Sequence, residues 1–159
     1  MVSIYFCHCI NYGAAAFFFP ETNTNWSQRH QCQKLQTHLH NSCEISTFQT
    51  SWLIEPFLSS YQPEGTTTVL CHKWATGVIS KEEDPLGLGR WSFLTLRGKK
   101  GCNVTLVTAY NSRYAPGPKS SYQQQNRLLS QIFRQNSITA KPSPHRQFIL
   151  DFQSWIIMN

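Results

Sequence analysis

A β-hairpin is the sequence feature that most restricts how this chain can fold. Residues Arg90–Arg97 alternate apolar and polar side chains, and residues Cys102–Tyr110 form a β-branched run. The linker Gly98–Gly101 separates the two segments, as is typical of a hairpin turn. We therefore expect two antiparallel strands. Arg90 should lie on the hairpin surface, Trp91 in or near the core, and the second strand in the centre of a sheet.

Further helices and strands are expected on both sides of this hairpin. Apolar spacing predicts helices, and short β-branched or apolar runs bounded by glycine or proline predict strands. The expected helices cover residues 25–40, 121–135 and 145–158, and the expected strands cover residues 44–52, 66–71 and 74–79.

Length and charge limit the classes of protein to consider. A chain of 159 residues with 40% hydrophobic content can bury one core. Only 14% of the residues are charged, and the formal net charge is +6. This balance favours a polyanionic partner such as nucleic acid, and an ordinary solvated basic surface is the alternative.

The amino-terminal segment is apolar, but its pattern is not typical of a targeting signal or a membrane span. The first positive side chain is Arg29, so the basic region of a secretion signal is missing. His8, Asn11 and Gly13 interrupt the only stretch with enough apolar residues to be a candidate membrane span. We expect an intracellular protein, cytoplasmic or nuclear, without membrane contact.

Six cysteines are scattered along the chain, and none forms a C-x-x-C pair. Reduced thiols in an intracellular protein are the simplest interpretation. The soft ligands in Cys7-His8-Cys9, and His38, His40 and Cys43, leave a small Cys/His metal-binding protein as an alternative. Against it, residues two apart on a helix point to different faces.

Two residues follow apolar runs directly and are the candidate site residues. Glu21 comes after Phe17–Pro20, and Tyr110 comes after Val104–Ala109. A rigid strand fixes the residue at its end, so an acid and a phenol in such places point to phosphodiester chemistry. The simpler alternatives are a solvated acid and a half-buried packing tyrosine.

Several short segments, taken in order, resemble endonuclease/exonuclease/phosphatase domains, and most closely the divergent copies in retrotransposon-like open reading frames. The resemblance covers roughly residues 17 to 158 and depends on the order of the segments. These segments are Pro20-Glu21-Thr22-Asn23-Thr24-Asn25-Trp26, Gly65-Thr66, Gly87-Leu88-Gly89-Arg90-Trp91-Ser92, Val107-Thr108-Ala109-Tyr110 and Gln147-Phe148-Ile149.

The resemblance implies an α+β fold: a partial four-layer α/β-sandwich, with two packed mixed sheets and outer helices. It divides the chain into a divergent segment, residues 1–16, and a partial domain, residues 17–159. It also implies a Mg²⁺-dependent phosphodiesterase or endonuclease of a mobile element that acts on nucleic acid. Glu21 matches the family's metal ligand and Tyr110 its catalytic tyrosine, while Asn111 and Arg113 would contact substrate.

The chain departs from the family pattern in the later motifs. An active member needs a first-strand asparagine, an Asp-x-Asn motif and a terminal Asp-His pair. Asn11 is the only candidate for the first-strand asparagine, and the other two motifs are absent. Asp151 is expected to be a helix-surface acid. We therefore expect a domain truncated at its carboxyl end, with little or no activity alone. The alternative is a non-catalytic nucleic-acid-binding remnant.

Overall fold

The computed structural model describes residues 15–53, 65–113, 120–136 and 143–158. Predictions that concern Asn11 and the segment Cys7–Cys9 lie outside these residues. The chain divides into two compact units, Met1–Tyr110 and Asn111–Asn159. The first unit holds both sheets, and the second holds two helices.

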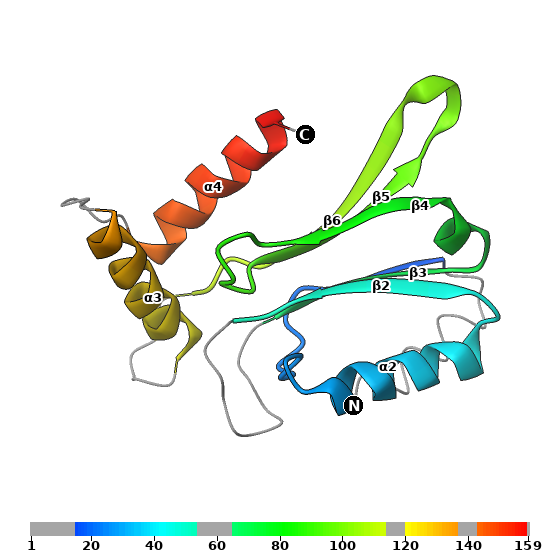
Figure 1. Ribbon diagram of the computed structural model, residues 1–159, viewed down its shortest axis with the longest axis horizontal. Helices are drawn as coiled ribbons and strands as arrows, with labels where there is room; N and C mark the ends of the chain where they lie inside the picture. Colours follow the sequence, from blue (N-terminus) through cyan, green and yellow to red (C-terminus); the bar gives the residue numbers. More distant parts are fainter. Residues whose placement is uncertain (1–14, 54–64, 114–119, 137–142, 159) are drawn as a thin grey trace. The chain divides into compact units, whose positions relative to one another are not determined.

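The first sheet has the strand order β1-β3-β2, and every pairing is antiparallel. β3 is buried along its whole length, because it lies between two strands and under a helix. Leu39 of that helix packs against Val69 of β3. Figure 1 shows the helix, α2, alongside the sheet that contains β2 and β3. The elements are β1 (Ala16–Phe19), α2 (Arg29–Ser42), β2 (Ser46–Ser51) and β3 (Thr66–Cys71).

The second sheet has the order β4-β5-β6 and contains the predicted hairpin. β4 (Val78–Glu83), β5 (Trp91–Arg97) and β6 (Asn103–Ala109) pair antiparallel, and the turn Lys99–Gly101 joins β5 to β6. The α+β class is therefore confirmed. The described strands pair only antiparallel, whereas mixed sheets were expected.

Two strand predictions in this region were wrong. Residues 72–77 form a 3₁₀ helix, because His72 takes a positive φ of 54° that ends the extended chain, and the strand begins only at Val78. The central strand of the described sheet is β5, while β6 pairs with β5 alone. Val104 of β6 is accordingly 50% exposed.

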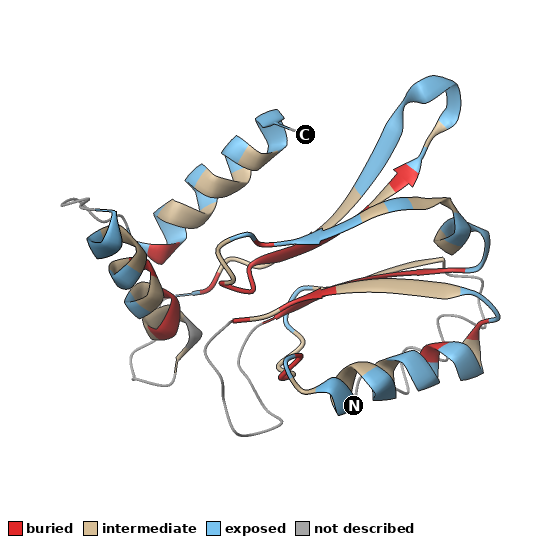
Figure 2. Cartoon of the chain, in the orientation of Figure 1, coloured by how far each residue is buried: buried red, intermediate tan, exposed pale blue. Residues whose placement is uncertain are grey.

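The two sheets pack face to face through a mixed interior. Figure 2 shows the buried residues gathered along β3 and β5. Leu70, Leu94 and Leu96 form an apolar cluster toward the start of β6. Toward the end of β6 the contacts are made by threonine hydroxyls. Thr68 Oγ1 lies 2.7 Å from Thr108 Oγ1 and donates to the backbone carbonyl of Ser92 at 2.9 Å.

A buried ion pair closes the loop between β4 and β5. Arg90 Nε donates to Asp84 Oδ2 at 2.7 Å and Nη2 to Asp84 Oδ1 at 2.9 Å, and both side chains are almost fully buried. The Arg90 guanidinium also lies 4.4 Å from the Trp91 ring centroid. The expectation of a surface Arg90 was therefore wrong, because Asp84 and Trp91 compensate the charge inside the protein.

The second unit consists of α3 (Ser121–Gln135) and α4 (Pro144–Met158), as the apolar spacing predicted. Ser120 caps α3, because its Oγ accepts a hydrogen bond from Gln123 N at 3.3 Å. Asp151 lies on α4 as expected, and its carboxylate accepts from Gln147 Nε2 at 2.6 Å. In the described parts of the chain, no helix is both long and apolar enough to cross a membrane.

The ion pair predicts a specific loss of stability. Asp84→Ala leaves the Arg90 guanidinium buried without its partner, so the free energy of unfolding should fall by about 3–5 kcal/mol. Urea denaturation followed by circular dichroism measures this change. Glu82→Ala, which removes an exposed acid from β4, the strand that ends just before Asp84, should change it by less than about 0.5 kcal/mol. Equal losses would show that the buried pair has no special role.

The hydroxyl contacts between the sheets predict a second difference. Thr68→Val keeps the shape of the side chain but removes the hydroxyl that contacts Thr108 Oγ1 and Ser92 O. The loss of these two buried hydrogen bonds should cost about 1–3 kcal/mol. The matched change Thr105→Val alters an exposed threonine, 3.1 Å from Thr95 Oγ1, and should cost less than about 0.5 kcal/mol. The midpoint of thermal unfolding should fall clearly for the first variant only.

Candidate functional site

The structure brings the ends of β1 and β6 to the same end of the packed sheets. β1 ends at Phe19, which pairs with Thr67, and β6 ends at Ala109, which pairs with Trp91. The hydroxyl contacts of Thr68, next to Thr67, join these regions across the interior. Glu21 and Tyr110 therefore follow strands that finish at the same end of the first unit.

The backbone after β1 forms a fixed turn that leaves Glu21 exposed. Thr22 N donates to Gly65 O at 3.0 Å, and the buried Trp26 donates from Nε1 to Thr22 Oγ1 at 2.8 Å. Asn23 has a positive φ of 49°, and its Nδ2 lies 3.4 Å from Glu21 Oε1. The carboxylate is thus held at the surface beside an amide, where it is open to a cation or to solvent.

Gly65 is required by the close packing of this turn. Its φ is +89°, and a Cβ atom there would lie 2.8 Å from Thr22 Oγ1 and 3.2 Å from Ser51 O. The second contact is with backbone, which cannot rotate away. Gly65, one of the residues in the family resemblance, therefore fits a steric requirement beside Glu21.

Tyr110 is held next to the loop that carries the buried ion pair. Its amide donates to Arg90 O at 2.7 Å, and its side chain is half-buried. Because Asp84 fixes Arg90, the backbone at the end of β6 is anchored to the interior. The backbone of Tyr110 is thus fixed, which suits a phenol that contacts substrate and equally a tyrosine that serves packing.

Asn111 and Arg113 belong to the second unit, which begins at Asn111. Asn111 is half-buried and Arg113 is exposed. An exposed guanidinium can form two hydrogen bonds to a phosphate. The substrate-binding roles of both residues stay predictions.

The described residues do not form a complete metal site. They contain no group of three or more histidine, cysteine, aspartate or glutamate side chains that could hold an ion. The carboxylate of Asp84 is already occupied by Arg90. A Mg²⁺ ion at Glu21 would therefore need oxygen ligands from water and from a bound phosphate, so these residues alone do not fit a protein-held magnesium site.

The Cys/His metal alternative also finds no support in the described residues. His38 and His40 are exposed on α2, whereas Cys43 is buried at the end of that helix. The Cys43 sulfur lies 3.2 Å from that of Cys71, away from solvent. The two exposed histidines and the buried cysteine therefore do not share one environment.

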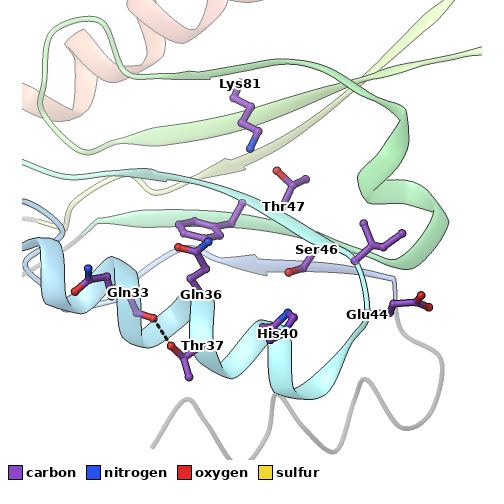
Figure 3. A pocket seen from close by; sticks show the side chains of 10 residues that line it. Gln33, Gln36, Thr37, His40, Glu44, Ser46, Thr47 and Lys81 are labelled. Atoms are coloured by element: carbon purple, nitrogen blue, oxygen red, sulfur yellow. Dashed lines mark hydrogen bonds between the residues drawn. The ribbon is translucent and has the colours of Figure 1, made fainter.

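Two pockets in the first unit were not predicted from the sequence. A polar groove of about 990 Å³ lies between α2 and β2, with Lys81 of β4 reaching toward it from the other sheet (Figure 3). His40 and Glu44 line the same groove. An apolar pocket of about 540 Å³ lies near the start of β6, rimmed by Lys73, Arg97 and Lys99. Glu21 and Tyr110 line neither of these pockets.

The signal for the groove was the polar face of the helix predicted over residues 25–40. That face alone could not show which strand would lie opposite it. Neither protein-family models, curated proteins nor solved structures yield a match to this chain. The family resemblance therefore stays a prediction, carried by the residues quoted for it.

The close packing around Gly65 predicts that an added side chain lowers stability more there than at an uncrowded glycine. Gly65→Ala and Gly101→Ala both place a side chain at a positive φ, +89° and +80°, but nothing lies within 4 Å of a Cβ atom at Gly101. Gly101→Ala should cost about 1 kcal/mol of unfolding free energy from backbone strain alone. Gly65→Ala should cost at least about 1 kcal/mol more. Equal costs in urea denaturation would contradict the packing of the Glu21 turn.

Proposed function

We propose that this chain binds nucleic acid through the end of the first unit that carries Glu21 and Tyr110. In this proposal it is part of a Mg²⁺-dependent phosphodiesterase or endonuclease domain of the mobile-element type, with little or no cleavage activity by itself. The observation that carries the proposal is the meeting of the β1 and β6 ends at one end of the packed sheets.

The chemistry of the two side chains supports a phosphate ligand. A phenol hydroxyl can donate to a non-bridging phosphate oxygen, where negative charge develops during cleavage. The Glu21 carboxylate would repel phosphate, so it suits such a site only when a cation lies between them. When bound, Mg²⁺ supplies charge neutralisation and polarisation of the phosphate. The formal net charge of +6 favours the same class of partner.

The expectation of weak activity follows from what the described residues supply. Groups that act as a unit lose most of the rate when one is absent. Glu21 and Tyr110 provide neither a general base nor a group of three metal ligands, and the described residues contain no such group. A second candidate function, nucleic-acid binding without cleavage, is favoured by this same observation.

Plasmid nicking tests the site assignment. Supercoiled DNA is incubated with the full chain in Mg²⁺ or in EDTA, and we expect slow nicking in Mg²⁺ only. Glu21→Ala and Tyr110→Phe should each lower the rate at least about 10-fold. The controls are Glu44→Ala, an exposed acid between α2 and β2, and Tyr122→Phe, a tyrosine of α3, and both should nick as the wild type does.

The nicking rates decide whether Glu21 and Tyr110 belong to a cleavage site. Equal rates for all five proteins would remove Glu21 and Tyr110 from the site. Absence of nicking by the wild type would leave binding without cleavage as the function, provided that the next measurement detects binding.

Binding of a fluorescent DNA oligonucleotide tests the role of Glu21 without any need for activity. Without Mg²⁺, Glu21→Gln should bind more tightly than the wild type, because a repulsive charge is gone. With Mg²⁺ the order should reverse, because the variant loses the ligand that holds the ion near phosphate. Glu44→Gln should show no reversal. The same order of affinities in both buffers would exclude a metal-linked role for Glu21.

A further inference from the structure

Two buried cysteines from distant parts of the sequence meet at one end of the first sheet. Cys43 is the residue after the last turn of α2, and Cys71 is the last residue of β3. Their sulfur atoms lie 3.2 Å apart. The residues are 28 positions apart in the chain, so this contact results from the fold and not from local sequence.

Backbone hydrogen bonds hold both cysteines in place. Cys43 N donates to Leu39 O at 2.8 Å, which closes the last turn of α2. His72 N donates to Ile45 O at 2.8 Å, and Cys71 is the register partner of Ser46. The segments that carry the two thiols are therefore held in place by backbone hydrogen bonds next to each cysteine.

The surroundings of the pair are apolar. Leu39 and Val69 are buried in the same cluster, and Phe17, Phe19 and Phe48 pack against it. Burial, followed by the hydrogen bond and the charge interaction with Cys43, raises the pKa of the Cys71 thiol to about 12. Both sulfur atoms are also shielded from solvent, so reaction requires a brief opening of the end of α2.

We propose that Cys43 and Cys71 are a redox modification site that forms a reversible disulfide with a small-molecule disulfide oxidant such as oxidised glutathione. Cys43, which is 5% exposed against 0% for Cys71, reacts first. Its thiolate attacks one glutathione sulfur, which forms a mixed disulfide and releases one glutathione thiolate. The Cys71 thiolate then attacks the Cys43 sulfur and releases the second.

The reaction balances without any further reagent. Two protein thiols are oxidised to one disulfide, oxidised glutathione is reduced to two glutathione molecules, and the two thiol protons pass to the glutathione thiolates. The new bond would link the end of α2 to the end of β3. Because it closes a loop in the unfolded chain, it should raise the unfolding temperature of the oxidised form.

Disulfide mapping of the wild-type full chain tests the proposal. The folded protein is incubated with oxidised glutathione, free thiols are blocked with N-ethylmaleimide, and the digest is analysed by mass spectrometry. The peptide pair joined through Cys43 and Cys71 should exceed every other cysteine pair at least about 10-fold, and dithiothreitol should abolish it. The same oxidation in concentrated urea should give mixed pairings, because the fold no longer selects the partner.

The proposal is overturned if the folded protein keeps glutathione on Cys43, or if either cysteine joins one of the four other cysteines of the chain instead. It is also overturned if both thiols remain fully available to the blocking reagent after unfolding. Cys102→Ser, which removes an exposed thiol, should leave the Cys43–Cys71 pair and the rise in unfolding temperature unchanged. Cys71→Ser should abolish both.

Discussion

The hydroxyl contacts between the two sheets are the constraint on which the candidate site depends. Thr68 is the centre of this network, because its Oγ1 contacts both Thr108 and Ser92 in the opposite sheet. Buried hydroxyls must meet their partners or lose stability, so they restrict how the two sheets can align. These contacts therefore set which part of β3 faces the end of β6, and so bring the residues after β1 and β6 to one end.

The buried Asp84–Arg90 pair extends this constraint to the surface. It fixes the loop whose carbonyl at Arg90 accepts the hydrogen bond of Tyr110 N. On the other side, Gly65 and Trp26 hold the turn around Thr22 and leave Glu21 exposed. The backbone at Tyr110 is thus held by a buried ion pair, and the turn at Glu21 is held by close packing. Rigid supports of this kind are what a phosphate-binding site requires.

Local patterns predicted the elements that depend on neighbouring residues. The hairpin, β3 and α3 follow from alternation, β-branching and helical spacing, and the structure confirms them. The sequence could not reveal contacts that depend on how a loop folds or on how separate elements meet. Arg90 was expected outside because its partner lies across a loop, and the Cys43–Cys71 contact needs the α2 and β3 ends to meet. The sequence predicted that Glu21 and Tyr110 follow strands. It could not predict that the two strands finish at the same end of the first unit, because this depends on how the sheets pack.

Backbone amide shifts of the isotope-labelled full chain, recorded during titration with a short DNA oligonucleotide in Mg²⁺, test the central claim most directly. The account predicts that the largest shifts fall on Glu21, Asn23 and Tyr110, because phosphate binds at the end where β1 and β6 finish. Shifts concentrated instead on Lys73, Lys99 and Lys100, near the start of β6, would contradict it. They would show that the oligonucleotide binds the basic residues at the other end of the sheets.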